Sequence, residues 1–147
     1  MPTKTVWVIA ADASRARVLQ VASRQKLAEV ASLLNPEGRM HERDLISDAH
    51  PRFRSGDSPA SDHQETSAVE HATEMFAKRI GHYLEKARTA HRYDELVVIA
   101  PPRLLGVLRR EYGEEVGKLV KDEVPKDLSW LSKQELEGYF SREGRSL

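Results

Sequence analysis

Two apolar patterns open the chain and predict a hairpin. Apolar residues run almost unbroken from Val6 to Ala11, whereas they alternate with polar residues from Ala16 to Ser23. An unbroken apolar run is typical of a strand covered on both faces of a sheet, and alternation is typical of a strand with one polar face. Asp12–Arg15 supplies turn-forming side chains between them. We therefore predict two paired strands, the first of which is central in the sheet.

The next apolar segment, Leu27–Leu34, predicts a third strand, although its Ala, Leu and Glu residues also favour helix. The three strands would form a meander, and an exposed edge of this meander would be one route to pairing between chains. A long polar stretch follows from Asn35 to Thr66, and we interpret it as a loop.

Helical patterns dominate the second half of the chain. Ser67 and Glu70 have the spacing of a capping box, so we predict that a long helix begins there. The apolar stripe of this helix recurs every three or four positions: Val69, Ala72, Phe76, Ile80, Tyr83, Leu84 and Ala87. Leu96–Ala100 predicts a buried strand, and Pro101-Pro102 would begin the next helix.

Two further elements complete the predicted fold. They are a short strand near Leu119 to Val124 and a final helix from Ser132, with Glu135 as its reciprocal cap. This order of elements predicts one α/β domain over residues 1–147. The domain would be a sandwich with flanking helices and a mixed five-stranded sheet, antiparallel in the opening meander and parallel later. Such an order fits a ribonuclease-H-like arrangement.

Composition narrows the range of functions. The chain has 147 residues, 23 basic and 23 acidic, so any binding of nucleic acid must be local. It has no cysteine, which excludes thiolate nucleophiles and cysteine zinc sites. Met1–Thr5 leads straight into a strand, and no apolar run approaches the ~20 residues that cross a bilayer. We expect a cytoplasmic protein without membrane insertion and without a cofactor.

The polar stretch contains the clearest candidates for binding. Arg43, Arg52 and Arg54 could bind phosphates, and Phe53, between two of these arginines, could stack on a base. The alternative is a solvated loop, because the acidic residues almost balance the arginines. These acidic residues are Glu37, Glu42, Asp44, Asp48, Asp57, Asp62 and Glu65.

Other candidate sites are isolated. Asp12 ends the first strand, where a nuclease of ribonuclease-H type would hold a metal ion, but it is equally explained as a turn former. Its possible partners are Asp94, Glu95, Asp122 and Glu123, and their spacing does not force them together. Arg103 follows Pro101-Pro102 and could bind an anion at a helix start, or simply lie on the surface. Gly106, within that helix, predicts close packing on the sheet.

Four segments resemble the bacterial host-attachment protein family. They are Val8–Leu19, Phe76–Ile80, Leu96–Arg109 and Lys126–Ser129. That family is similar to the central domain of archaeal and eukaryotic peptide-chain release factors, which implies a ribonuclease-H-like sandwich. In release factors, Gly-Gly-Gln before the long helix assists hydrolysis of peptidyl-tRNA. The corresponding region here, Ser47–Ser58, has one glycine and no glutamine, so no catalytic residue can be assigned.

The resemblance and the residues together leave three hypotheses. The first is a non-enzymatic binding protein that engages RNA, tRNA or a ribosomal component through the polar stretch. The second is a protein-interaction module that affects host attachment or a surface-polysaccharide pathway. The third is a hydrolase, either a metal-dependent nuclease or an esterase. The sequence indicates neither the ligand nor the oligomeric state.

Overall fold

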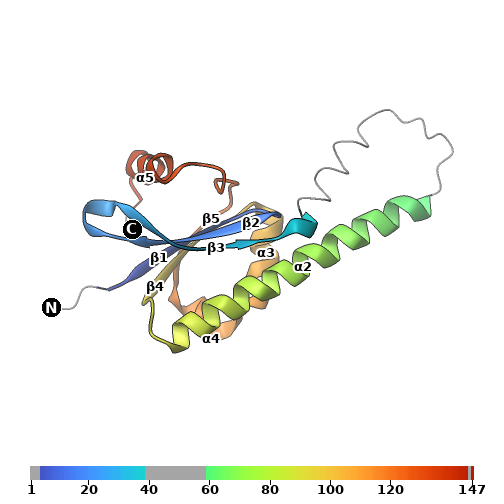
Figure 1. Ribbon diagram of the computed structural model, residues 1–147, viewed down its shortest axis with the longest axis horizontal. Coiled ribbons are helices and arrows are strands. Elements are labelled where there is room, and N and C mark those ends of the chain that lie inside the picture. The colour runs from blue at the N-terminus through green and yellow to red at the C-terminus, as the bar shows by residue number, and fades with distance from the viewer. Residues whose placement is uncertain (1–3, 39–58, 146) are drawn as a thin grey trace.

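The fold is a single mixed sheet with helices on both faces (Figure 1). The structure is a computed structural model that describes residues 4–38, 59–145 and 147. Its strands and helices are β1 (Val6–Ala11), β2 (Arg15–Val21), the 3-10 helix η1 (Ser23–Gln25), β3 (Leu27–Leu34), α2 (Pro59–Thr89), β4 (Glu95–Ile99), α3 (Pro102–Glu111), α4 (Gly113–Leu119), β5 (Val120–Val124) and α5 (Lys133–Arg142).

The five strands lie in the order β3-β2-β1-β4-β5. β1 pairs antiparallel with β2, and β2 pairs antiparallel with β3. On the other side, β4 runs parallel to β1, and β5 runs parallel to β4. The predicted mixed five-stranded sheet, with its opening meander and central first strand, is therefore confirmed.

Each face of β1 contributes to a different core, because successive strand side chains point to opposite faces. Trp7, Ile9 and Ala11 belong to the core beneath α2, α3 and α4. Val6, Val8 and Ala10 belong to the core beneath α5. Figure 1 shows these helices on the two sides of the sheet. Burial on both faces explains why β1 has no polar residue.

Helix α2 begins earlier than the sequence predicts. It starts at Pro59, so the polar loop does not extend to Thr66, and Ser67 with Glu70 lies inside the helix instead of capping it. The early turns carry no apolar stripe to reveal them, whereas proline at a first helical position is well tolerated. Although α2 has 31 residues, no helix within the described ranges is both long and apolar enough to cross a membrane.

Close helix packing occurs at Gly81. The prediction that Gly106 packs closely on the sheet was wrong. A Cβ atom at Gly81 would lie 2.6 Å from the carbonyl oxygen of Glu111, so α2 approaches the end of α3 directly through its backbone. A Cβ atom at Gly106 would meet nothing within 4 Å. The sheet-facing side of α3 is formed instead by its leucines, Leu104, Leu105 and Leu108.

The predicted cap of α5 is confirmed. The Ser132 hydroxyl accepts a hydrogen bond from the Glu135 amide at 3.1 Å, and the Glu135 carboxylate accepts one from the Ser132 amide at 2.8 Å. This reciprocal pair satisfies two amides that the helix itself leaves free. It also fixes the point where the connection from β5 turns into α5.

Candidate functional site

The candidate site lies where the parallel strands end. β1, β4 and β5 finish at the same edge of the sheet, which is where open α/β sheets commonly bind ligands. We define the carboxyl edge as residues 12–15, Asn35 and residues 125–131. Asn35 is buried there, donating from its side chain to the Ala13 carbonyl at 2.9 Å and from its amide to the Ser14 carbonyl at 2.8 Å. The chain therefore reaches Gly38, the last described residue before position 59, from this edge.

Asp12 organises the carboxyl edge. Its Oδ1 accepts hydrogen bonds from the amides of Ser14 and Arg15, at 2.8 and 2.9 Å, and from the Ser14 hydroxyl at 2.9 Å. Its Oδ2 accepts one from the hydroxyl of the buried Ser129 at 2.6 Å. The interpretation of Asp12 as a turn former is confirmed, and the bond to Ser129 also joins two segments that lie 117 positions apart.

Burial and hydrogen bonding act in opposite directions on Asp12. Burial raises the pKa of its carboxyl group, but the hydrogen bonds from Ser129, Ser14 and Arg15 outweigh burial, so the pKa is lowered overall. A lowered pKa means that the folded state stabilises the ionised carboxylate more than the unfolded chain does. The stabilising contribution is then complete above the ordinary pKa of about 3.9 and disappears as the pH falls through the lower, folded-state value.

We therefore expect Asp12→Asn to destabilise the protein at neutral pH by about 2 kcal/mol, the scale of a hydrogen bond to a charged group. The difference from wild type should shrink as the pH falls below about 4, because the carboxyl group then binds a proton in the unfolded chain and, at lower pH, in the folded state as well. Urea unfolding of both proteins between neutral and strongly acidic pH measures this difference. Parallel stability curves over the whole range would contradict the assignment.

Arg17 fixes the segment beside Asp12. Its guanidinium donates to the carbonyl oxygen of Ser129 at 3.0 Å and to that of Leu131, and it pairs with Glu29 at 2.7 Å. The Trp130 backbone between these carbonyls is held on both sides. The Trp130 indole N–H in turn donates to the Asp127 carbonyl at 2.8 Å.

Trp130 is the feature that makes this edge a candidate site. Arg17 holds the backbone on either side of Trp130, and the indole N–H is bonded to Asp127, yet the residue is 63% exposed. A large aromatic ring in water is an apolar surface without a partner, and tryptophan held in place has little conformational entropy to lose on binding. The chain has only one other tryptophan, Trp7, which is 1% exposed in the core. Sequence reasoning missed Trp130, although a tryptophan in a polar turn just before a helix cap was a signal.

The structure does not bring the other predicted residues together. Arg43, Arg52, Phe53 and Arg54 lie outside the described residues. Arg103 is exposed near the start of α3, and its guanidinium pairs with Glu70 of α2 at 2.9 Å.

The carboxylates suggested as metal ligands are also separate. Asp94 and Glu95 lie at the start of β4, at the opposite end of the sheet from Asp12. Asp122 pairs with Arg145, and Glu123 pairs with Arg109. Across residues 4–38 and 59–145, no three His, Cys, Asp or Glu residues are placed to hold a metal ion.

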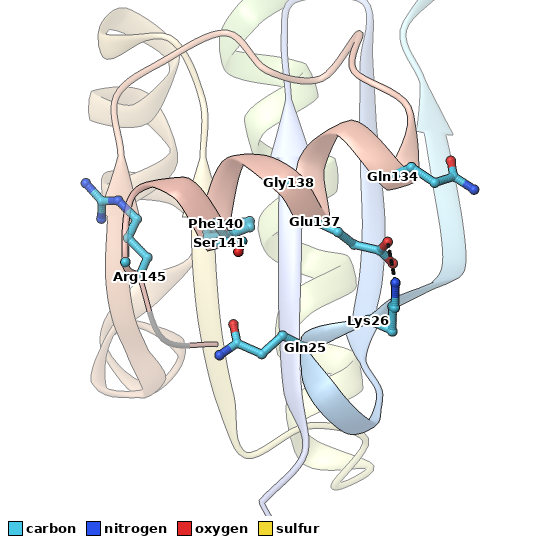
Figure 2. A pocket seen from close by; sticks show the side chains of 9 residues that line it. Gln25, Lys26, Gln134, Glu137, Gly138, Phe140, Ser141 and Arg145 are labelled. Atoms are coloured by element: carbon cyan, nitrogen blue, oxygen red, sulfur yellow. Dashed lines mark ion pairs between the residues drawn. The ribbon is translucent and has the colours of Figure 1, made fainter.

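The structure also has a hollow between α5 and the connection from β2 to β3. It has a volume of about 640 Å³ and is lined by Gln25, Lys26, Glu137 and Arg145 among others (Figure 2). Its charged side chains already have partners. Glu137 accepts from the Leu27 amide at 2.7 Å and lies 3.9 Å from Lys26, and Arg145 pairs with Asp122. This hollow therefore offers no free charged group for a ligand.

The fold and the carboxyl edge define the class of this protein. It is an α/β protein with a mixed sheet, helices on both faces and an exposed, firmly held tryptophan beyond the parallel strands. The sequence model of the family described as "Protein required for attachment to host cells" matches residues 7–140. The chain belongs to this family, and the predicted family resemblance is confirmed.

Other comparisons add less. The chain is 37% identical over 68 residues to "Uncharacterized protein RP470" of Rickettsia prowazekii (strain Madrid E), a match covering 45% of this chain and 44% of that relative. The match thus spans less than half of either protein. Among solved structures, a "pCBH ParM non-polymerisable quadruple mutant" is similar at a TM-score of 0.46 and 9% identity, over 95% of this chain and 48% of that chain. The ribonuclease-H-like classification and the release-factor relationship stay predictions.

Proposed function

We propose that this protein is a non-enzymatic, cytoplasmic binding protein that takes single-stranded RNA at the carboxyl edge, with Trp130 as the stacking platform. The observation that carries the proposal is the contrast between the fixed backbone of Trp130 and its exposed ring. Every base has a flat π face, so an immobilised tryptophan can bind unpaired bases without reading their sequence. Duplex RNA hides these faces, which makes single strands and loops the ligands that fit.

The polar segment would supply the phosphate contacts in this proposal. Arg43, Arg52 and Arg54, with Phe53 as a second stacking residue, belong to the part of the chain that continues from Gly38. Gly38 lies against the Ala13 carbonyl at the carboxyl edge, where a Cβ atom would have no room. The formal net charge of the chain is zero, so the positive charge that binds phosphates would have to come from these nearby arginines. A relationship to release factors would be consistent with a ligand from translation.

The proposal predicts that a single-stranded oligouridylate quenches Trp130 fluorescence and binds more weakly to Trp130→Ala. Truncating a stacked aromatic ring costs about 1–3 kcal/mol, so affinity should fall roughly 5- to 150-fold. Binding of the variant is measured by fluorescence anisotropy of a labelled oligonucleotide, and wild-type quenching is measured directly. Because Trp7 is buried, Trp130 is the accessible fluorophore.

Two further variants sharpen this test. Met75→Ala removes another exposed apolar side chain, 45% exposed on α2, and should leave RNA affinity unchanged. Arg52→Ala combined with Arg54→Ala should weaken binding and lower the slope of log affinity against log salt by about 1.4, at ~0.7 for each lost phosphate contact. A wild-type protein that binds no RNA, or a Trp130→Ala variant that binds as tightly as wild type, would refute the proposal.

A protein ligand is the second candidate, and the charges near the site favour it. Arg103 is paired with Glu70, and Arg15 lies 3.8 Å from Asp12, so two of the basic groups near this end of the sheet already have acidic partners. Tryptophan is also enriched among residues that dominate protein interfaces. Crosslinking in cells, followed by identification of attached RNA and protein, separates the candidates. Recovery of a protein partner without RNA, lost in Trp130→Ala, would favour the second.

A further inference from the structure

β3 is an edge strand, and the Leu27 amide at its start donates to Glu137 of α5 at 2.7 Å. It pairs with β2 on one side only, and within residues 4–38 and 59–145 no strand pairs with its other side. An edge strand presents backbone N–H and C=O groups that can pair with a strand of another chain. At its end, the Leu34 carbonyl accepts a hydrogen bond from the Arg79 guanidinium at 2.9 Å, which ties this end of β3 to α2.

The edge lacks the side chains that usually prevent pairing. β3 contains no proline and no lysine, and its single charged residue, Glu29, is neutralised by Arg17 at 2.7 Å. A register shift leaves Val30 without a partner on β2, after which Ala31–Leu34 pairs regularly with β2. This regular part is uncharged. Within the described residues, Ala31–Leu34, beyond the bulge, is therefore the part of the edge suited to receive a strand.

Exposed apolar side chains flank the same segment. Leu34 at its end is 64% exposed, and Met75 on α2, one turn before Arg79, is 45% exposed. With Trp130, these are the large hydrophobic residues exposed in the described part of the chain. Two of the three therefore lie where α2 meets the end of β3. A strand added to β3 would cover apolar surface as well as backbone groups.

We propose that a second copy of this chain pairs antiparallel with β3 around a two-fold axis at Ser32. Such an axis places Ser32 opposite its own counterpart and Ala31 opposite Leu33 of the other copy. Ala31 and Leu33 both pack toward the core under α2, so these side chains lie on the same face, as antiparallel pairing requires. No like charges face each other, because the segment carries none. The result is one continuous sheet through both copies.

A second copy fits this edge better than an unrelated strand. In a two-fold pairing, the central residue of the strand faces the same residue of the other copy. Ser32, a small uncharged residue between alanine and leucine, can face its counterpart without a clash or like charges. The formal net charge of zero also removes long-range repulsion between copies. The pairing uses Ala31–Leu34, none of which is proposed to bind RNA, so the two proposals are tested with different residues.

Analytical ultracentrifugation over a concentration series tests the proposal. Wild type should approach twice the chain mass of 16.6 kDa as concentration rises. Ala28→Lys with Ser32→Lys adds charges at two exposed positions of β3 and should give a monomer over the same range. The matched control, Ala90→Lys with Ser141→Lys, makes the same two exchanges at exposed positions elsewhere and should dimerise like wild type. Circular dichroism establishes that both variants are folded.

A cysteine variant gives a second readout that does not depend on disrupting the edge. The chain has no cysteine, so Ser32→Cys introduces one thiol per copy. Residues facing each other across a strand pair have Cα atoms about 4.5–5.5 Å apart, which a disulfide can bridge. Mild oxidation should crosslink Ser32→Cys efficiently and Ser141→Cys only weakly. A wild type that stays monomeric, a lysine variant that still dimerises, or equal crosslinking of the two cysteine variants would overturn the proposal.

Discussion

Replacing Trp7 with alanine is expected to lower the free energy of unfolding by about 3–5 kcal/mol, the range for truncating a buried large aromatic residue. Trp7 is 1% exposed at the centre of the sheet. Its ring stacks on Tyr93 at a centroid distance of 5.0 Å, and its indole N–H donates to the Gln20 side chain at 3.1 Å. The substitution would leave a cavity in the core.

Urea unfolding followed by far-ultraviolet circular dichroism measures this loss. Trp130→Ala is the matched control, because it makes the same exchange at a residue that is 63% exposed. We expect that control to change stability by no more than about 0.5 kcal/mol. Similar losses in the two variants would mean that Trp7 does not hold the core together as described.

The second large effect is expected for Arg17→Met, which removes the guanidinium and keeps an apolar stem. The Arg17 side chain is 13% exposed. Its loss leaves the carbonyl oxygens of Ser129 and Leu131 without their shared donor, and we expect a loss of about 2–3 kcal/mol. The ring of Trp130 should also move more freely, because its backbone is no longer fixed on both sides.

Two measurements separate these effects. Urea unfolding gives the stability, and the steady-state fluorescence anisotropy of Trp130 in a Trp7→Phe background gives the mobility of its ring. Arg15→Met is the control, since the Arg15 side chain is 40% exposed and lies 3.8 Å from Asp12. An exposed ion pair of this kind contributes at most about 1 kcal/mol. Unchanged anisotropy in Arg17→Met would show that Arg17 does not position Trp130.

Sequence reasoning predicted the elements whose signals are local. The apolar run of β1 and the Ser132–Glu135 pair of α5 each depend on residues close together in the chain. Helix α4 (Gly113–Leu119) was not predicted, because it contains two glycines and only Val116 is buried. The start of α2 was placed too late for a related reason, since its first turns have no apolar periodicity.

The candidate site was harder to predict because long-range contacts form it. Ser129 reaches Asp12 across 117 positions, and Arg17 reaches Leu131 across 114. Nothing near Trp130 in the sequence indicates that its backbone is fixed by an arginine on another strand. The residues predicted for binding, Arg52-Phe53-Arg54, were found from their residue types and the position of Phe53 between two arginines, and their positions lie outside the described residues.

The length of α2 has a consequence for the segment between Gly38 and Pro59. The backbone of α2 runs for about 13 residues, or roughly 20 Å at 1.5 Å per residue, before Ala72, the first of its described side chains that is buried. Figure 1 shows this part of α2 extending past the sheet. Gly38, before the segment, therefore lies at the sheet, whereas Pro59, after the segment, lies at the end of α2 that extends past the sheet. Each residue inserted between Pro59 and Ala72 would rotate Pro59 about the helix axis by about 100°, since 3.6 residues complete a turn. Helical phase, as much as helix length, would then determine the direction that Pro59 faces.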